Sequence, residues 1–200
     1  MSHELSKSIT RRLGNPNFVS RYFVGNGVDI GCGDDPLSRH ALSFARMMTC
    51  LGYDKQSGDA QYMNEIPDET FDFVHSSHCL EHLPEPYLAI QEWLRILKPG
   101  GYMIVMVPDE DLYEQGVWPS IFNDDHKHTF TIRKAKSWSP KSINVVDLID
   151  LYGVKPIKIE LVDTNYDYGI YYAQFKVGRR TDQSLIEGTE VGIELVLKKL

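Results

Sequence analysis

The chain has few cysteines, and they are not spaced as pairs. Its 200 residues include three cysteines, which are Cys32, Cys50 and Cys79, and no C-x-x-C motif, so a disulfide scaffold and a structural zinc site are disfavoured. No segment approaches the roughly 20 consecutive apolar residues that cross a bilayer. Polar residues occupy Met1 to Arg12, where a secretory signal has its apolar core. We therefore expect a cytoplasmic protein without membrane insertion.

Basic residues are outnumbered, and repeats and low-complexity tracts are missing. The chain carries 21 Lys and Arg against 28 Asp and Glu, a net charge of -7, which argues against nucleic acid as the partner. The hydrophobic content of 42% suffices for one substantial core, and domains typically hold roughly 100–200 residues. We predict a single domain over residues 1–200 with its core at about 20–180.

A glycine loop is the strongest local signal. The apolar run that begins at Val28 breaks at Gly31 and Gly33, and doubly wound α/β sheets bind ligands at this point, beyond the first strand. The third glycine of a dinucleotide fingerprint is missing, because Pro36 takes its place. The next acids, Asp34 and Asp35, would repel phosphate and suit a cation or sugar hydroxyls. The loop therefore predicts a nucleoside-like ligand without phosphate.

Strand-like and helix-like stretches alternate along the chain, which predicts a parallel sheet with crossover helices. The patterns predict strands at 71–74 and 102–107, a helix at 86–97 closed by a turn at 98–101, and a second helix from Ser139-Pro140 to Gly153 that buries Ile143, Val146, Ile149 and Tyr152. An antiparallel hairpin is predicted from strands at 157–162 and 171–177. The last 20 residues match no pattern.

Two regions allow more than one interpretation. Helical spacing over 37–48 would lead into a strand at 49–53 that ends at Asp54; the alternative is a strand at 41–45, which has no acid at its end. Residues 109–139 are irregular and too long for a loop without a function. We interpret them as a substrate-region insert.

Four motifs in order resemble the class I S-adenosylmethionine-dependent methyltransferases of the small single-domain type. They are Val28 to Gly33, Gly58 to Ala60, Phe71 to Leu83 and Glu92 to Gly101, and the resemblance extends over about Asn26 to Asp109. It implies an α/β fold with a doubly wound, Rossmann-like seven-stranded sheet, mostly parallel with an antiparallel C-terminal strand. It also implies S-adenosylmethionine as cofactor, which has ribose hydroxyls, an adenine and a sulfonium.

The resemblance also implies a set of cofactor-binding residues. They are Asp29, Gly31, Cys32, Gly33, Asp54, Asp59, Ala60, Ser76 and Ser77. In this interpretation the glycine loop shapes the methionine site and Asp54 binds the ribose diol. Asp59 and Ala60 meet the adenine, and the serines lie beneath the reactive methyl. Turn or cap roles remain the alternative for Asp54, Asp59 and the serines, and Cys32 is a small filler rather than a nucleophile.

Four residues are candidate general bases: His78, His126, His128 and Asp109. The run His78 to His82 also fits H-x-x-E-H, an inverted zinc-protease motif. That motif needs a sustained helix and a distant third ligand, whereas Pro84 and Pro86 follow at once. We therefore predict no metal, and for His126 and His128 a structural loop role is the alternative.

The predicted reaction is displacement of S-adenosylhomocysteine by a small-molecule or sugar acceptor that attacks the sulfonium methyl group through oxygen. Alignment of donor and acceptor supplies much of the rate, and a general base is needed only for a weak acid such as a hydroxyl. The alternative is a chain that binds the cofactor without turnover, as a partner or regulatory subunit.

Overall fold

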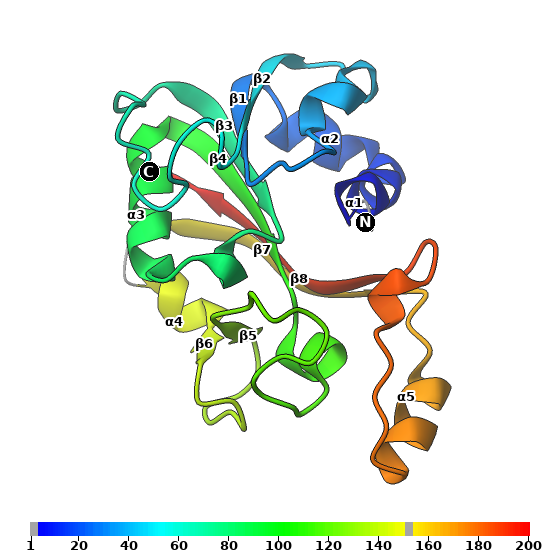
Figure 1. Ribbon diagram of the computed structural model, residues 1–200. Coiled ribbons are helices and arrows are strands. Elements are labelled where there is room, and N and C mark those ends of the chain that lie inside the picture. The colour runs from blue at the N-terminus through cyan, green and yellow to red at the C-terminus, as the bar shows by residue number, and fades with distance from the viewer. Residues whose placement is uncertain (1–3, 151–153) are drawn as a thin grey trace.

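A six-stranded sheet forms the centre of the protein (Figure 1). The computed structural model describes residues 4–150 and 154–200, and the strand order is β2-β1-β3-β4-β8-β7. The strands are β1 (Gly25–Ile30), β2 (Met47–Tyr53), β3 (Phe71–Ser77), β4 (Leu97–Val107), β7 (Lys155–Thr164) and β8 (Glu190–Lys198). The first four pair in parallel, and β8 is antiparallel to both β4 and β7. The mostly parallel sheet with an antiparallel C-terminal strand is confirmed, but in the described residues it has six strands rather than seven.

Helices pack on both faces of this sheet (Figure 1). They are α1 (Glu4–Leu13), α2 (Pro16–Tyr22), η1 (Leu37–Ser43), α3 (Pro86–Ile96) and α4 (Val145–Asp150). The buried Trp93 of α3 and Leu148 of α4 belong to one apolar cluster, whereas Ile9 of α1 and Phe18 of α2 belong to another. The arrangement is doubly wound, as predicted, because each face has its own core.

The second strand ends at Asp54, as the first of our two interpretations predicted. β2 runs from Met47 to Tyr53, so the alternative strand at 41–45 is wrong. The preceding helix is shorter than the predicted 37–48, since η1 ends at Ser43. The predicted turn at 98–101 lies within β4 as an irregularity, where the register against β3 shifts.

The predicted hairpin has the wrong second strand. Residues 171–177 fall largely in α5 (Tyr168–Lys176), which begins where the Asp167 carboxylate accepts a hydrogen bond from the Ile170 N–H at 2.9 Å. The aromatic run favours a strand by propensity, but β8 pairs with β7 instead. On its other side β8 pairs with β4, where Gly192 permits a close approach, because a Cβ there would lie 2.5 Å from the carbonyl oxygen of Val107.

The second predicted helix starts later than expected. Ser142–Asn144 forms β6, which pairs with β5 (Thr129–Thr131) in a separate two-stranded sheet. α4 begins only at Val145, where the Asn144 side chain accepts a hydrogen bond from the Val146 N–H at 2.9 Å. The predicted end of this helix, at Tyr152 and Gly153, lies outside the described residues. Three short helices complete the chain: η2 (Leu80–His82), η3 (Glu110–Glu114) and η4 (Gln183–Leu185).

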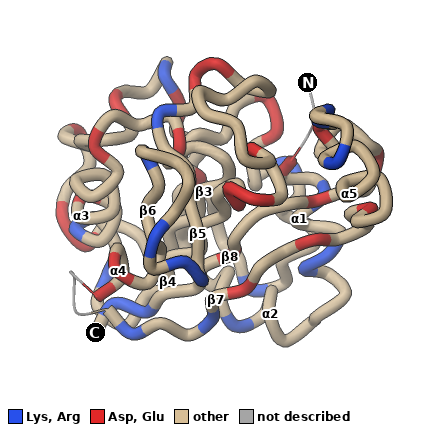
Figure 2. The backbone as a smooth tube through the Cα atoms, turned by 90° about the horizontal axis from the view of Figure 1, so that it is seen from below, with Lys and Arg blue, Asp and Glu red and all other residues tan. Residues whose placement is uncertain are grey.

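Among the described helices, none is long and apolar enough to cross a membrane. Figure 2 shows basic positions on several elements with acidic positions between them. In the part of the chain that the structure describes, the charges are therefore not separated into one basic and one acidic half.

A chain of buried polar contacts ties α1 to the sheet. The Arg12 guanidinium lies 2.7 Å from the Glu194 carboxylate of β8 and 3.0 Å from Nε2 of His75. Since arginine can only donate, Nε2 accepts and the His75 Nδ1–H donates to Asp29 at 2.6 Å. The other carboxylate oxygen of Asp29 accepts from the Leu37 N–H at 2.7 Å. The contacts run from the N-terminal helix to the end of β1 and on to η1.

Removal of Arg12 should therefore destabilise the fold strongly. We expect Arg12→Leu to lower the free energy of unfolding by about 3–5 kcal/mol at about pH 7. Glu194 loses its fully buried partner and keeps only Arg11 and Lys158, at 2.8 and 3.1 Å, and Nε2 of His75 loses its donor. Burial opposes ionisation of Glu194, but Arg12 and Arg11 hold its pKa below the usual range. The stability that this carboxylate contributes is thus present above its unfolded pKa and is lost as pH falls. Urea unfolding of both proteins at about pH 7 and about pH 4 measures the difference.

The exposed Arg39 of η1 provides the control, because Arg39→Leu should change stability by no more than about 0.5 kcal/mol. The difference in free energy of unfolding between Arg12→Leu and the wild type should be smaller at the lower pH, because Glu194 takes up a proton in the variant. Equal losses in the two variants would contradict a special role for the buried contact.

Candidate functional site

The carboxyl ends of β1 to β4 share one edge of the sheet, and the glycine loop lies there. The Gly31 N–H donates to the Tyr53 carbonyl at 2.8 Å. The Asp54 carboxylate accepts from the Gly33 N–H at 2.5 Å. The structure thus brings Asp54 directly beside the loop, and the amides of Gly31 and Gly33 make their hydrogen bonds within the protein.

Gly31 cannot carry a side chain. Its φ is +72°, in the left-handed region that costs other residues energy. A Cβ at this position would lie 2.5 Å from both Cβ and Sγ of Cys79. The loop turns sharply because the segment after β3 packs directly against it, a contact that the sequence pattern did not reveal.

A cavity of about 210 Å³ opens beside the loop. It is lined by Glu4, Leu5, Asp29, Gly31, Cys32, Gly33, Asp34, Asp35, Ser77 and His78. Four of these residues are acids, and none of the described lining residues is Lys or Arg. The cavity therefore has a negative lining, which favours a cation and hydroxyl donors over a phosphate.

Helix α1 covers the cavity, and sequence reasoning did not predict this. Glu4 and Leu5 contribute to the lining, and the Ser6 N–H and hydroxyl both donate to the Asp35 carboxylate, at 3.0 and 2.7 Å. The polar and apolar residues of α1 alternate with a helical period, so its amphipathic pattern was the available signal.

Two of the predicted cofactor residues in this loop are held by the protein itself. Asp29 is 1% exposed, and both its oxygens accept hydrogen bonds, from His75 and from the Leu37 N–H. Burial raises the pKa of the Cys32 thiol to about 11, so this cysteine is a thiol at neutral pH. Asp29 braces the loop, and Cys32 fits the small-filler interpretation.

The end of β3 carries polar atoms without a protein partner. The hydroxyl of Ser77 and Nε2 of His78 are buried, yet neither of them makes a hydrogen bond, whereas the Ser76 side chain contacts Cys79. His78 adopts φ +53° while its N–H donates to the Met106 carbonyl at 2.9 Å. Buried polar groups are nearly always paired, so these atoms leave hydrogen-bonding capacity that a bound ligand would use.

Asp59 and Ala60 do not line the cavity. The exposed Asp59 accepts from the Gln61 N–H at 2.8 Å, an Asx-turn contact. The Ala60 carbonyl accepts from the Trp93 indole at 2.8 Å. Their adenine contact remains a prediction.

Asp109 caps η3 rather than facing the cavity. Its carboxylate accepts from the N–H groups of Asp111 and Leu112, at 3.0 and 3.1 Å. Burial raises the pKa of Asp109 to about 6. This pKa suits a general base, but the two hydrogen bonds show that the carboxylate has a structural role at the start of η3.

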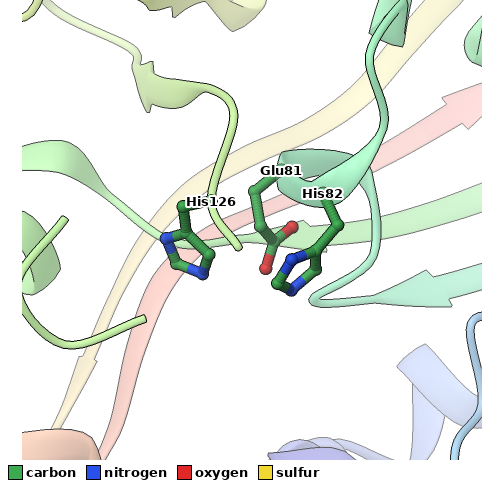
Figure 3. Close-up of side chains that lie close together, drawn as sticks. All are labelled: Glu81, His82 and His126. Atoms are coloured by element: carbon green, nitrogen blue, oxygen red, sulfur yellow. The ribbon is translucent and has the colours of Figure 1, made fainter. Parts of the chain in front are cut away.

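The insert brings a histidine against the segment after β3. His126 lies with Glu81 and His82 so that one ligand atom of each falls within 4.8 Å of the others, and Figure 3 shows the three side chains pointing into one space. His128 lies apart, with its Nε2–H donating to the Pro84 carbonyl at 3.1 Å. Of the four candidate bases, only His78 lines the cavity.

A family profile described as a methyltransferase domain matches residues 1–142, which is more than half of the chain. The chain belongs to this methyltransferase family. The methyltransferase is of the S-adenosylmethionine-dependent type that its motifs predicted. The acidic cavity and the close backbone of the glycine loop fit this cofactor.

Curated relatives match only a part of the methyltransferase. An uncharacterized methyltransferase of Schizosaccharomyces pombe is 39% identical over 64 residues, 32% of this chain and 22% of that protein. The ubiquinone biosynthesis O-methyltransferase of Aliivibrio fischeri is 36% identical over 76 residues, 38% of this chain and 32% of that protein. The matched segments therefore span a third or less of these two relatives.

The fold has solved counterparts over its whole length. A SAM-dependent methyltransferase from Archaeoglobus fulgidus superposes with a TM-score of 0.62 at 18% identity, covering 99% of this chain and 95% of that one. At this identity the likeness shows the fold alone.

The contact between Gly31 and Cys79 can be tested by a matched pair of glycine variants. Gly100 has φ +79° but open space where a methyl group would lie, so Gly100→Ala should cost only the backbone term of about 1–2 kcal/mol. Gly31→Ala should lower the free energy of unfolding by about 1–3 kcal/mol more than Gly100→Ala, because its methyl group would also press against Cys79. Denaturant unfolding of both variants gives the difference. Equal losses would mean that the segment after β3 relaxes freely.

Proposed function

We propose that this methyltransferase binds S-adenosylmethionine in the cavity beside the glycine loop and transfers its methyl group to a hydroxyl oxygen of a small-molecule or sugar acceptor. The observation that carries the proposal is the acidic cavity that ends in unpartnered polar atoms of Ser77 and His78. The predicted cofactor needs a negative surface for its sulfonium and acceptors for its ribose diol. The acids of the cavity supply the first, and Asp54, which lies beside the glycine loop but not in the cavity lining, would supply the second.

The placement of the donor follows from the geometry of the loop. The backbone of Gly31 and Gly33 would contact the methionine moiety, since no side chain intervenes there. The two carboxylate oxygens of Asp54 accept main-chain hydrogen bonds from the Gly33 N–H and the Lys55 N–H, at 2.5 and 2.6 Å. Each oxygen keeps a further lone pair, which would accept from the ribose hydroxyls. The methyl group would then lie toward Ser77 and His78, at the end of β3.

The reaction needs no covalent intermediate with the protein. The acceptor oxygen forms a bond to the methyl carbon, the carbon–sulfur bond breaks, and its electron pair stays on sulfur to give S-adenosylhomocysteine. The hydroxyl proton passes to a base. His78 is the candidate that the cavity favours, because its Nε2 is buried beside the cavity without a hydrogen-bond partner.

A small acceptor is supported by two observations. The Aliivibrio fischeri relative is an O-methyltransferase of ubiquinone biosynthesis, and the chain carries a net charge of -7, which disfavours polyanionic acceptors such as RNA. We also propose that the protein acts in the cytoplasm and that it has no nucleic-acid partner.

The acceptor class is tested with the labelled methyl group of S-adenosylmethionine. Purified protein is incubated with panels of catechols and other phenols, of sugars, of bulk protein and of RNA, and products are identified by mass spectrometry. Methyl ethers of the small hydroxyl compounds are the expected products. Exclusive labelling of protein or RNA, or of nitrogen, would contradict the proposal.

The cofactor position is tested by Asp54→Asn. This change keeps the side-chain shape but removes the charge, and hydrogen bonds to charged groups contribute about 1.5–3 kcal/mol. We expect calorimetric titration to show the Kd for S-adenosylmethionine and for S-adenosylhomocysteine rising by about 10- to 100-fold.

Asp147→Asn, at an exposed position of α4, is the matched control and should leave both Kd values unchanged. If Asp54→Asn bound both compounds as the wild type does, the ribose role of Asp54 would be ruled out. Failure of the folded wild type to bind either compound would rule out the proposed function.

A further inference from the structure

The cluster of Glu81, His82 and His126 has the composition and spacing of a metal-binding site. A carboxylate oxygen and two imidazole nitrogens lie within 4.8 Å of one another, and the three side chains converge (Figure 3). Two imidazoles and a carboxylate suit first-row transition metals such as Zn²⁺, Mn²⁺ and Fe²⁺. The ligands come from η2 and from the insert after β4.

In both histidines, a contact at Nδ1 orients the imidazole ring. Nδ1 of His126 lies 2.6 Å from the buried Glu114 carboxylate, and Nδ1 of His82 lies 3.3 Å from the Asp125 carbonyl and 3.1 Å from its carboxylate. An acceptor opposite Nδ1 places the proton there, so that Nε2 carries the free lone pair. Metal-bound histidines in proteins show this carboxylate or carbonyl partner on the other ring nitrogen.

Glu81 has a buried carboxylate whose oxygens make no hydrogen bond. The residue is 0% exposed, and neither carboxylate oxygen makes a hydrogen bond. Burial opposes its ionisation, but the neighbouring His78 and the other histidines lower the pKa of Glu81 below its usual value. The nearest contact is His78 Nδ1 at 3.4 Å, within reach of attraction but without hydrogen-bond geometry. Buried charges are normally paired or bound to a metal.

The backbone fixes the three ligands relative to one another. The Glu81 carbonyl accepts from the N–H groups of Lys127 and His128, at 2.8 and 3.3 Å. These bonds hold the insert against η2 directly beside His126. The ring centroids of His82 and His126 are 5.0 Å apart in an edge-to-face arrangement. The site is therefore built by main-chain contacts and not by side-chain convergence alone.

We propose that Glu81, His82 and His126 bind one divalent transition-metal cation, whose open coordination positions take the hydroxyl oxygen of the acceptor. The acceptor part rests on the proposed function; the metal site does not. A coordinated hydroxyl loses its proton more readily, so it becomes a better nucleophile for the methyl group. His78 connects the two places, since it contacts Glu81 and lines the cofactor cavity.

Sequence reasoning set a metal aside because H-x-x-E-H lacked a sustained helix and a distant third ligand. The structure gives Leu80–His82 as a single short turn, in which Glu81 and His82 supply adjacent ligands, and it brings His126 from the insert as the third. The geometry therefore leads us to the opposite expectation, with a ligand set different from that of the protease motif.

Metal binding is tested without reference to activity. The protein is stripped with a chelator and titrated with Co²⁺, whose visible d–d absorption reports imidazole and carboxylate coordination, and then with competing Zn²⁺. We expect one equivalent to bind. His82→Ala, at a partly exposed site, and the isosteric Glu81→Gln should each weaken binding by more than about 100-fold, and Glu114→Gln by about 10- to 100-fold.

His128→Ala is the matched control, because it removes a histidine of the same segment whose Nε2 bonds to Pro84, and it should keep the wild-type affinity. Thermal unfolding confirms that each variant is folded. Absence of Co²⁺ or Zn²⁺ binding by the folded wild type would overturn the metal site. Binding that persists in both His82→Ala and Glu81→Gln would overturn it as well.

The acceptor role has its own test. The stripped protein should bind S-adenosylmethionine in calorimetry with an unchanged Kd but should lose methyl transfer, which added Zn²⁺ or Mn²⁺ restores. Full turnover by the stripped protein would overturn the acceptor role. Loss of cofactor binding by the metal-loaded protein would instead identify a failure of the proposed function.

Discussion

The buried contacts from Glu194 through Arg12 and His75 to Asp29 connect parts of the molecule that are far apart in sequence. They join the last strand, the first helix and the end of β1 across one face of the sheet. Such a network is stabilising because each buried charge has an opposite charge or a hydrogen-bond acceptor beside it, and a single unpaired buried charge is costly. Nη2 of Arg12 has no hydrogen-bond partner in it. The position of α1 over the cavity and the position of Asp29 under the glycine loop are consequences of the same set of bonds.

The segment from Ser77 to His82 borders both the proposed cofactor cavity and the proposed metal site. Its first residues border the glycine-loop cavity, and Cys79 packs against Gly31. Its last residues, Glu81 and His82, turn toward the insert and meet His126. A methyl donor and an acceptor must approach within contact distance for transfer. A short segment that borders both places can align them without any movement of the larger elements.

Local patterns predicted those parts of the fold that local chemistry determines. The strand–glycine–acid pattern around Gly31 located the loop, and Asp54 was found because an acid ends β2. Long-range pairing was not predictable in this way. The aromatic run at 171–177 has strand propensity, yet it lies largely in α5, and β7 pairs instead with β8 from the end of the chain. In the same way, His126 meets Glu81 through the fold of the insert, which no spacing in the sequence encodes.

The acidic lining of the cavity has a consequence for the end of the reaction cycle. The methyl donor carries a positive sulfonium, whereas the product is a neutral thioether at the same atom. A negative surface made by Glu4, Asp34 and Asp35 attracts the first and is indifferent to the second. With the cofactor bound as proposed, electrostatics at this site would favour the methyl donor over the spent cofactor, and it would counter the product inhibition that two ligands of nearly the same shape would otherwise produce.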